Sequence, residues 1–240
     1  MSDIQVFFIH FAGGNRYSFQ FLSPYLKGHD IHHLELPGRG KRVKEPLLNN
    51  FSDAVDDIFK QISGIAKKPY LIFGHSLGAG LALKVCEKLE ATGKAPIYLV
   101  VSGNAGPGVG KPKRRYDLDD QDFKTELRNL GVVPEEVLKD DELFNFFNPI
   151  LRADFRIAEE NNKNFDTPVN TPIYALMGSE EEYVESISNW SNFTTSIFNY
   201  KVLNGNHFFI YDYPKKIASV IHNCVEIGLM KYPKNQFLGI

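Results

Sequence analysis

The stretch from Tyr70 to Ala82, YLIFGHSLGAGLA, constrains the chain more than any other part of the sequence. An apolar run typical of a β-strand leads into Gly74–Gly78, a G-x-S-x-G sequence, and an Ala/Leu-rich run typical of a helix follows. In this context the serine, Ser76, lies on a strained strand-to-helix turn, and the glycines beside it avoid collisions with neighbouring backbone. The alternative is a chance match in an ordinary turn. The strand before and the helix after the motif favour a nucleophile at Ser76.

Short apolar runs bounded by turn residues alternate with stretches of helical periodicity along most of the chain. The runs predict six β-strands. They lie at residues 4–10, 30–36, 70–75, 97–103, 172–178 and 198–205. Between them, apolar residues recur on one helical face in residues 51–65 and again after Ser76. This alternation predicts an α/β fold, with a largely parallel sheet covered by helices on both faces.

The segment at about 106–164 interrupts the alternation, because no convincing strand falls within it. A loop rich in Gly, Pro and basic residues leads into two helical pieces. Asp119 or Asp120 caps the first piece, and Pro134 opens the second. An all-helical insertion between two strands of a parallel sheet predicts a lid over the carboxyl ends of those strands. We expect one domain over residues 1–240 that contains this lid, since a chain of this length can bury a core of its own.

A serine hydroxyl needs a base to take its proton. In hydrolases with this type of serine turn, the chain order is serine, acid, histidine. Only His207 and His222 follow Ser76. His207 lies in a Gly/Asn turn after the last predicted strand, whereas His222 lies within a predicted helix, where a lone histidine is more often a surface or packing residue. We therefore predict that His207 is the base.

The acid that orients this histidine is expected in the loop after the strand at 172–178. That loop contains no aspartate but three consecutive glutamates, Glu180, Glu181 and Glu182. We choose Glu181, because it stands three residues after Gly178, where the loop should turn toward the histidine. We expect Glu180 and Glu182 to be solvated.

The oxyanion of an acyl-transfer reaction needs N–H donors, one of them the backbone amide of the residue after the nucleophile. That residue is Leu77. The second donor is expected in the loop after the first predicted strand, HFAGGN, where Gly13 and Gly14 let the backbone approach a ligand closely. Ala12 is the candidate, and Phe11 is the adjacent alternative.

Charge and cysteine content exclude several classes of protein. The 27 basic and 29 acidic residues give a net charge of −2, without the basic excess of a nucleic-acid-binding protein. No run reaches the roughly 20 apolar residues of a membrane span, and the first residues lack a signal-peptide pattern. Two cysteines, Cys86 and Cys224, are too few for a disulfide framework or a four-ligand metal site, so we expect a reduced, cytoplasmic setting.

The 19 phenylalanines indicate large apolar surfaces or an acyl-sized cavity. Phe11 lies in the predicted oxyanion loop, and Phe146 and Phe147 lie in the predicted lid. We name these three as candidate lining of an acyl pocket. Plain core packing is the more common role of a helical Phe/Leu stripe.

Several motifs together resemble those of the type II thioesterases associated with non-ribosomal peptide and polyketide synthases. They are HFAGG (10–14), LPGRGKR (36–42), PYLIFGHSLGAG (69–80), VSGNAGPG (101–108), ELRNLGVVPEEVL (126–138), NPILRADFRIAEE (148–160) and GNHFF (205–209). The LPGRG and LRADF elements are far more specific than G-x-S-x-G alone. The resemblance covers nearly the whole chain and implies an α/β-hydrolase fold with a helical lid.

By this resemblance the protein is a serine thioesterase that hydrolyses acyl thioesters on the phosphopantetheine arm of an acyl or peptidyl carrier protein. Ser76 is then the nucleophile and His207 the base, and the family's aspartate position falls on Glu181. The reaction needs no metal and no cofactor. We expect the protein to act as a monomer, without nucleic acid or membrane as a partner.

Two basic elements have competing interpretations. In LPGRGKR, Arg39 either pairs with a carboxylate in a structural turn, which we favour, or contacts substrate. The run KPKRR at 111–115 is either a solvated loop, which we favour, or a surface that steers an acidic carrier protein.

Two other functions remain open. A small-molecule carboxylesterase or lipase would share the triad and differ in the leaving group. A non-catalytic binding protein on a hydrolase scaffold is suggested only by the missing aspartate.

Overall fold

The computed structural model describes residues 4–111, 113–160, 165 and 167–231. Its central element is a six-stranded sheet, with one strand for each predicted run. The strands are β1 (Gln5–Ile9), β2 (Asp30–His33), β3 (Tyr70–His75), β4 (Tyr98–Ser102), β5 (Ile173–Gly178) and β6 (Phe198–Leu203). Neighbours in the order β2-β1-β3-β4-β5-β6 are all parallel, which confirms the predicted α/β fold.

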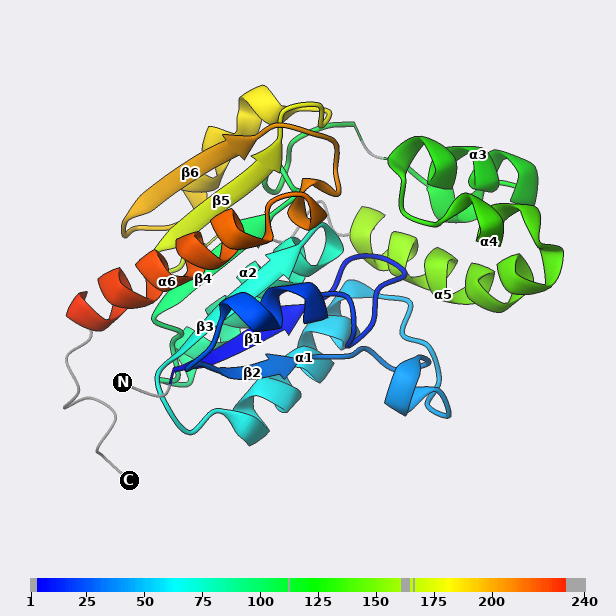
Figure 1. The fold of residues 1–240 in the computed structure, drawn as a ribbon. Coiled ribbons are helices and arrows are strands. Elements are labelled where there is room, and N and C mark those ends of the chain that lie inside the picture. Colours follow the sequence, from blue (N-terminus) through cyan, green and yellow to red (C-terminus); the bar gives the residue numbers. More distant parts are fainter. Residues whose placement is uncertain (1–3, 112, 161–164, 166, 232–240) are drawn as a thin grey trace.

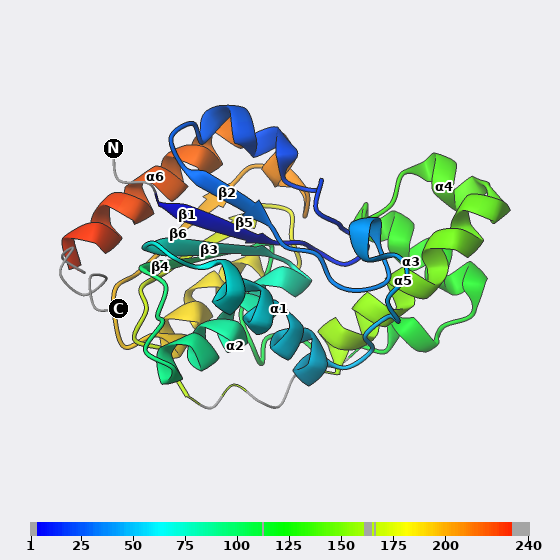
Figure 2. The ribbon, with the colours of Figure 1, turned by 90° about the horizontal axis from the view of Figure 1, so that it is seen from below.

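Helices cover both faces of the sheet (Figure 1). Figure 2 shows α1 (Phe51–Ile65) and α2 (Leu77–Ala91) on one face and α6 (Pro214–Lys231) on the other. Alternate residues along a strand point to opposite faces of the sheet and pack into two separate hydrophobic cores, one on each face. In β1, Phe7 packs into the core that contains α1 and α2, and Phe8 packs into the core that contains α6.

Capping side chains determine where two of the helices begin. The Asn50 side chain accepts the Asp53 amide at the start of α1. Asp119 caps α3 (Asp120–Leu130) by accepting the Asp122 amide, which settles the choice between Asp119 and Asp120.

A helical segment follows β4 and precedes β5, and it projects beyond the carboxyl ends of the strands (Figure 1). It holds α3, α4 (Glu135–Lys139) and α5 (Asp141–Glu159). Pro134 precedes α4, as predicted, but the second helical piece is two helices, because Asp140 caps a new helix with its side chain. These helices fall within residues 106–164, where a lid is expected, and residues 112 and 161–164 of that range lie outside the described ones. Their role as a lid stays a prediction.

Short 3-10 helices complete the structure. They are η1 (Gln20–Tyr25), η2 (Gly40–Arg42), η3 (Arg115–Asp117), η4 (Val184–Phe193) and η5 (Phe209–Tyr211). In the part of the chain that the structure describes, no helix has the length and apolar character needed to cross a bilayer. The single domain expected over residues 1–240 extends beyond the described residues at both ends and stays a prediction.

Candidate active site

Ser76 lies at the turn between β3 and α2, in a backbone conformation that L-residues rarely adopt. Its φ is 57° and its ψ is −115°, which costs on the order of 1–3 kcal/mol. A Cβ on Gly74 would lie 2.1 Å from the Gly78 oxygen, and a Cβ on Gly78 would lie 2.2 Å from the Ile9 oxygen. Both glycines are therefore required, and the first turn of α2 packs directly on the end of β1.

His207 and Glu181 form a short hydrogen bond at the carboxyl end of the sheet. Nδ1 of His207 lies 2.6 Å from Oε2 of Glu181, and the Glu181 side chain is only 7% exposed. The other carboxylate oxygen, Oε1, accepts the Gly178 amide over 2.7 Å. The carboxylate thus holds one imidazole nitrogen of His207 and leaves Nε2 for another partner.

Gly178 allows the loops after β5 and β6 to meet. A Cβ at this position would lie 2.4 Å from the Asn206 oxygen, so only glycine permits the approach. The Glu181 amide also donates to the Gly178 oxygen over 3.2 Å and closes a tight turn. This turn accounts for the spacing of three residues between Gly178 and Glu181, on which the prediction of Glu181 as the acid rests.

The neighbouring glutamates lie in different surroundings. Lys113 binds Glu182 at 2.9 Å and lowers the pKa of its carboxyl group, and Glu180 is exposed. Of the three glutamates in the loop, the structure brings Glu181 to His207.

Two other histidines have partners or surroundings that do not suit a base. His222 lies on α6, where its Nδ1 is 3.0 Å from Nε2 of His29. His75 is fully buried, and its Nδ1 lies 3.0 Å from the Ser102 hydroxyl. Burial lowers the pKa of His75 well below its usual value, so this imidazole stays neutral. It packs against His207, with 4.9 Å between ring centroids.

The predicted oxyanion donors, Leu77 and Ala12, are both buried, with 5% and 7% of their surface exposed. Among the described residues, neither backbone N–H donates a hydrogen bond. Leu77 is the first residue of α2, where amides have no partner within the helix. The packing of Gly78 on Ile9 brings the start of α2 next to the chain that leads into Ala12.

Two cavities adjoin these residues. One of about 570 Å³ is lined by His207 and Glu181, and the other, of about 230 Å³, is lined by Ser76 and Leu77. The two share three wall residues. These are Asn104, Gly106 and Val109. The parts of the chain described here contain no cluster of three His, Cys, Asp or Glu side chains that could hold a metal ion.

Sequence reasoning did not single out Asn104. Its side-chain Nδ2 donates to the backbone carbonyl oxygen of Ser76 over 3.3 Å, and its own backbone carbonyl oxygen accepts from Nε1 of Trp190 over 2.7 Å. Asn104 follows β4 at the same edge of the sheet as Ser76. A polar residue directly after a central parallel strand is the signal that could have identified it.

The three phenylalanines expected in an acyl pocket do not line these two cavities. Phe11 is 8% exposed and packs edge-on against His75, with 5.8 Å between ring centroids. Phe146 is 61% exposed and contacts the ring of Phe147. Phe147 borders a third cavity of about 110 Å³, with apolar walls and Gly13 at one side.

The LPGRG and LRADF elements meet in a buried ion pair. Two nitrogens of Arg39 bind the two oxygens of Asp154 at 2.5 and 2.7 Å, and the side chains are 4% and 0% exposed. Asp154 also accepts the Gly13 amide at 2.8 Å, and Arg39 donates to the Gly14 oxygen at 3.2 Å. Arg39 thus pairs with a carboxylate, which is the role that the sequence favours. The ion pair joins α5 to the loop that carries Ala12.

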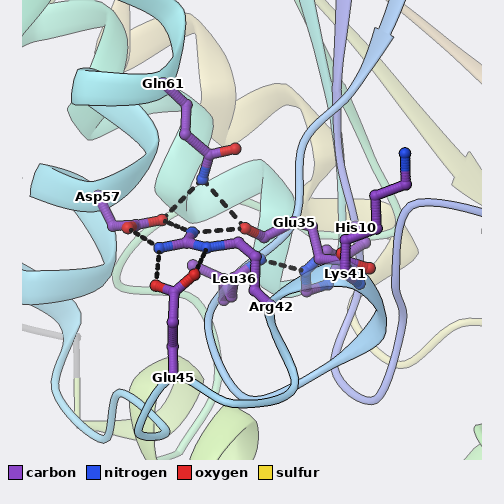
Figure 3. Close-up of polar contacts among 8 residues, drawn as sticks. All are labelled: His10, Glu35, Leu36, Lys41, Arg42, Glu45, Asp57 and Gln61. Carbon is purple, nitrogen blue, oxygen red and sulfur yellow. Dashed lines mark hydrogen bonds and ion pairs between the residues drawn. The ribbon is translucent and has the colours of Figure 1, made fainter.

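A second polar cluster surrounds Arg42 of LPGRGKR (Figure 3). Arg42 donates to both oxygens of Asp57 at 2.7 and 2.8 Å and to Glu45 at 2.6 Å. These carboxylates raise the pKa of Arg42. Gln61 donates to Asp57 and to the Glu35 backbone oxygen, which Arg42 also binds. This cluster ties the loop to α1.

The basic run at 111–115 is largely neutralised within the chain. Three of its residues form ion pairs with acidic neighbours. The pairs are Lys113 with Glu182, Arg114 with Asp117, and Arg115 with Glu126 and Glu159. Residue 112 lies outside the described residues.

Comparison of the sequence with known proteins identifies its relatives. A family model described as Thioesterase domain matches residues 4–225. Gramicidin S biosynthesis protein GrsT of Aneurinibacillus migulanus is 30% identical over 238 residues, which cover 97% of this chain and 92% of that protein. The medium-chain S-acyl fatty acid synthase thioesterase of Homo sapiens is 28% identical over 209 residues, which cover 83% of this chain and 78% of that protein.

Solved structures show the same fold over nearly the whole chain. ClbQ from the colibactin NRPS/PKS pathway has a TM-score of 0.87 at 26% identity, covering 95% of this chain and 99% of its own. The type II thioesterase BorB from the borrelidin biosynthetic cluster has a TM-score of 0.85 at 26% identity, covering 93% of each chain. With a family match over residues 4–225, the chain belongs to the thioesterase family and is a thioester hydrolase of the α/β-hydrolase fold.

Proposed function

We propose that this thioesterase removes acyl groups from the phosphopantetheine arm of acyl or peptidyl carrier proteins, and so edits or releases acyl groups in non-ribosomal peptide or polyketide biosynthesis. One observation carries the assignment of the site: the bond of 2.6 Å between Glu181 and His207, beside the strained turn of Ser76. The names of the relatives support the substrate class, since GrsT belongs to gramicidin S biosynthesis and ClbQ to the colibactin pathway.

The reaction proceeds through an acyl-serine. The hydroxyl oxygen Oγ of Ser76 attacks the thioester carbonyl carbon while Nε2 of His207 takes the hydroxyl proton, and Glu181 stabilises the imidazolium. The C–S bond then breaks, and His207 protonates the departing thiolate. In the second half, His207 takes a proton from water, and the resulting hydroxide attacks the acyl-serine. The serine oxygen leaves with the proton from His207, and the carboxylic acid is released.

The amides of Leu77 and Ala12 bind the oxyanion in both halves of the reaction. Their lack of partners within the described chain supports this role. The Phe11 amide is a weaker candidate, because the His10 oxygen of the same peptide faces α2, 2.8 Å from where a Gly78 Cβ would lie. In a planar trans peptide the N–H points the opposite way, so the Phe11 N–H points away from the helix. Loss of one donor of this kind costs about 10²–10³ in kcat.

The cavity beside Ser76 is the proposed acyl site. At about 230 Å³ it exceeds the apolar cavity of about 150 Å³ that holds benzene in an engineered protein. Its walls include the rings of Phe51 and Phe165 and the ion pair of Arg115 with Glu159. A short acyl chain fits this space, and the helical segment of α3 to α5 acts as its lid.

Chain-length profiles test the acyl site. We expect acetyl to butyryl pantetheine thioesters to be hydrolysed faster than octanoyl. Phe146→Ala should leave this profile unchanged, because its ring is 61% exposed. Phe147→Ala enlarges the apolar cavity at Gly13 and tests whether a longer chain can extend there. A wild-type preference for octanoyl would contradict the assignment of the short site.

Ser76→Ala tests the nucleophile. We expect hydrolysis of an acyl-carrier-protein thioester to fall at least about 10³-fold, with Ser188→Ala, an exposed serine of η4, as the matched control. Full activity of Ser76→Ala would refute the proposal. Labelling of Ser76 by a fluorophosphonate separates a hydrolase from a binding protein on the same scaffold, since only an activated serine reacts.

The leaving group separates a thioesterase for carrier proteins from a general esterase. We expect a higher kcat/KM for the carrier-bound thioester than for a p-nitrophenyl ester with the same acyl group. A preference for the oxygen ester would favour the carboxylesterase alternative. We also propose that the protein works as a monomer, which size-exclusion chromatography with light scattering tests directly.

A further inference from the structure

His10 lies directly after β1 and is almost completely buried, with 1% of its surface exposed. Its two ring nitrogens contact two backbone groups. Nδ1 lies 2.8 Å from the Phe11 carbonyl oxygen. Nε2 lies 3.3 Å from the Leu36 amide nitrogen, a contact that Figure 3 shows. Both ring nitrogens are therefore engaged by the backbone, and none is left for substrate.

These partners define the tautomer of His10. A carbonyl oxygen can only accept, so Nδ1 carries the proton, and the Leu36 amide can only donate, so Nε2 presents its lone pair. Burial, assisted by the Arg39 guanidinium, lowers the pKa of His10 to about 4. At neutral pH the ring is uncharged, and the donor to Phe11 is always present.

The Phe11 carbonyl belongs to the same peptide unit as the Ala12 N–H. In a planar trans peptide these two groups point in opposite directions, so a bond that holds the carbonyl also aims the N–H. The Phe11 oxygen also accepts the Gly14 amide over 2.9 Å, which closes a four-residue turn with Gly13 at φ 75°. That turn is typical of type II, which requires a positive φ at its third residue.

The remaining contacts of the turn hold other peptide units. Asp154 binds the Gly13 amide, and Arg39 binds the Gly14 carbonyl. Neither of them contacts the peptide between Phe11 and Ala12. Among the described side chains, His10 is the one that does.

We propose that His10 is a positioning residue that preorganises the oxyanion hole by fixing the orientation of the Ala12 amide. The inference rests on the proposed roles of Ser76 and Ala12. An amide aimed in advance at the developing oxyanion lowers the barrier to reaction without strengthening substrate binding. Loss of the His10 bond should therefore lower kcat and leave KM nearly unchanged.

Two substitutions separate this role from simple core packing. The side-chain amide of Asn reaches about as far as Nδ1 of histidine, so His10→Asn keeps a donor for the Phe11 oxygen. The amide of Gln reaches about as far as Nε2, so His10→Gln keeps a partner for Leu36 and loses the donor to Phe11. Both fill most of the space of the ring, and His10→Ala removes both contacts.

The experiment measures kcat and KM for an acyl-carrier-protein thioester and the rate of fluorophosphonate labelling of Ser76. We expect His10→Asn to lose at most about threefold in kcat, and His10→Gln and His10→Ala to lose about 10–100-fold, less than the full loss of a donor because the Gly14 bond remains. Labelling should slow in parallel, since the phosphoryl oxygen occupies the same hole. KM should stay within about twofold.

Controls distinguish a failure of this inference from a failure of the site. His33→Asn removes a half-buried imidazole that stacks on Phe8, outside the turn, and should leave kcat unchanged. Equal kcat values for His10→Asn and His10→Gln, or losses that follow thermal unfolding rather than the position of the side-chain amide, would overturn the role of His10. If Ser76→Ala kept its activity instead, the proposed site itself would be wrong.

Discussion

Replacement of Glu181 by Gln removes one charge from the site and keeps the shape of the side chain. In the proposed mechanism the carboxylate faces an imidazolium in the transition state, because His207 has taken the proton of Ser76. Two unit charges about 4 Å apart at an effective dielectric constant of about 20 attract by about 4 kcal/mol. The Glu181 side chain is only 7% exposed, so solvent screens this attraction little. Since 1.36 kcal/mol is a factor of ten in rate, kcat should fall about 10³-fold.

Glu181→Asp keeps the charge and shortens the side chain. One C–C bond is about 1.5 Å, so the contact with His207, now 2.6 Å, would open to about 4 Å. Loss of a hydrogen bond to a charged group costs about 1.5–3 kcal/mol, which corresponds to about 10–100-fold in kcat. The order of activity should be wild type, then Glu181→Asp, then Glu181→Gln.

Steady-state hydrolysis of an acyl-carrier-protein thioester measures these variants, and circular dichroism verifies that they fold. KM should change by less than about twofold, because the carboxylate does not contact the substrate in the ground state. Glu180→Gln and Glu182→Gln are matched controls and should lose less than about twofold. If Glu181→Gln kept its kcat within about threefold, or if Glu180→Gln lost as much, the assignment of the acid would be refuted.

Three further predictions concern stability and reactivity. Asp154→Asn leaves the buried guanidinium of Arg39 without its counter-charge, which should cost about 3–5 kcal/mol and lower Tm by on the order of 10 °C in calorimetry; a wild-type Tm would contradict this. The pKa of His10 is about 4 in the folded protein and about 6.5 in the unfolded chain. Between these pH values the unfolded chain therefore binds one more proton than the folded protein. As the pH falls from 6.5 to 4, up to about 3 kcal/mol of stability should be lost. Denaturant midpoints should therefore depend less steeply on pH in His10→Asn, and equal slopes would show that His10 is not responsible. Burial raises the pKa of both Cys86 and Cys224, which are 0% and 1% exposed, so a thiol reagent at pH 8 should modify neither in the native protein and both after denaturation; rapid modification of the native protein would disprove their protection.

The sequence predicted the elements whose signals are local. Each strand of the sheet falls within one apolar run, and the turn at Ser76 follows from five consecutive residues. Glu181 and His207 are 26 residues apart. Their pairing is predicted from the order of catalytic groups along the chain and from the spacing of three residues after Gly178, and not from any periodicity. The break between α4 and α5 does not show in the sequence pattern, because Asp140 lies within one continuous helical run and only its side chain, capping α5, reveals a new helix.

Long-range polar contacts could not be predicted from patterns in one sequence. Arg39 and Asp154 are 115 residues apart, and nothing near either residue indicates which partner it will meet. Asn104 was overlooked for the same reason, because its contact with Ser76 exists only once β3 and β4 are adjacent. A helical stripe of Phe and Leu likewise does not tell which ring faces inward, and Phe146 faces outward.

The four parallel strands that lead into the proposed catalytic groups give the chain an inactive period during its synthesis. Ala12 follows β1, Ser76 follows β3, Glu181 follows β5 and His207 follows β6. A chain still on the ribosome therefore has the proposed nucleophile, Ser76, long before the proposed base, His207. In the proposed mechanism it cannot hydrolyse thioesters until β6 has paired with β5, and the appearance of activity during refolding would time the docking of that strand.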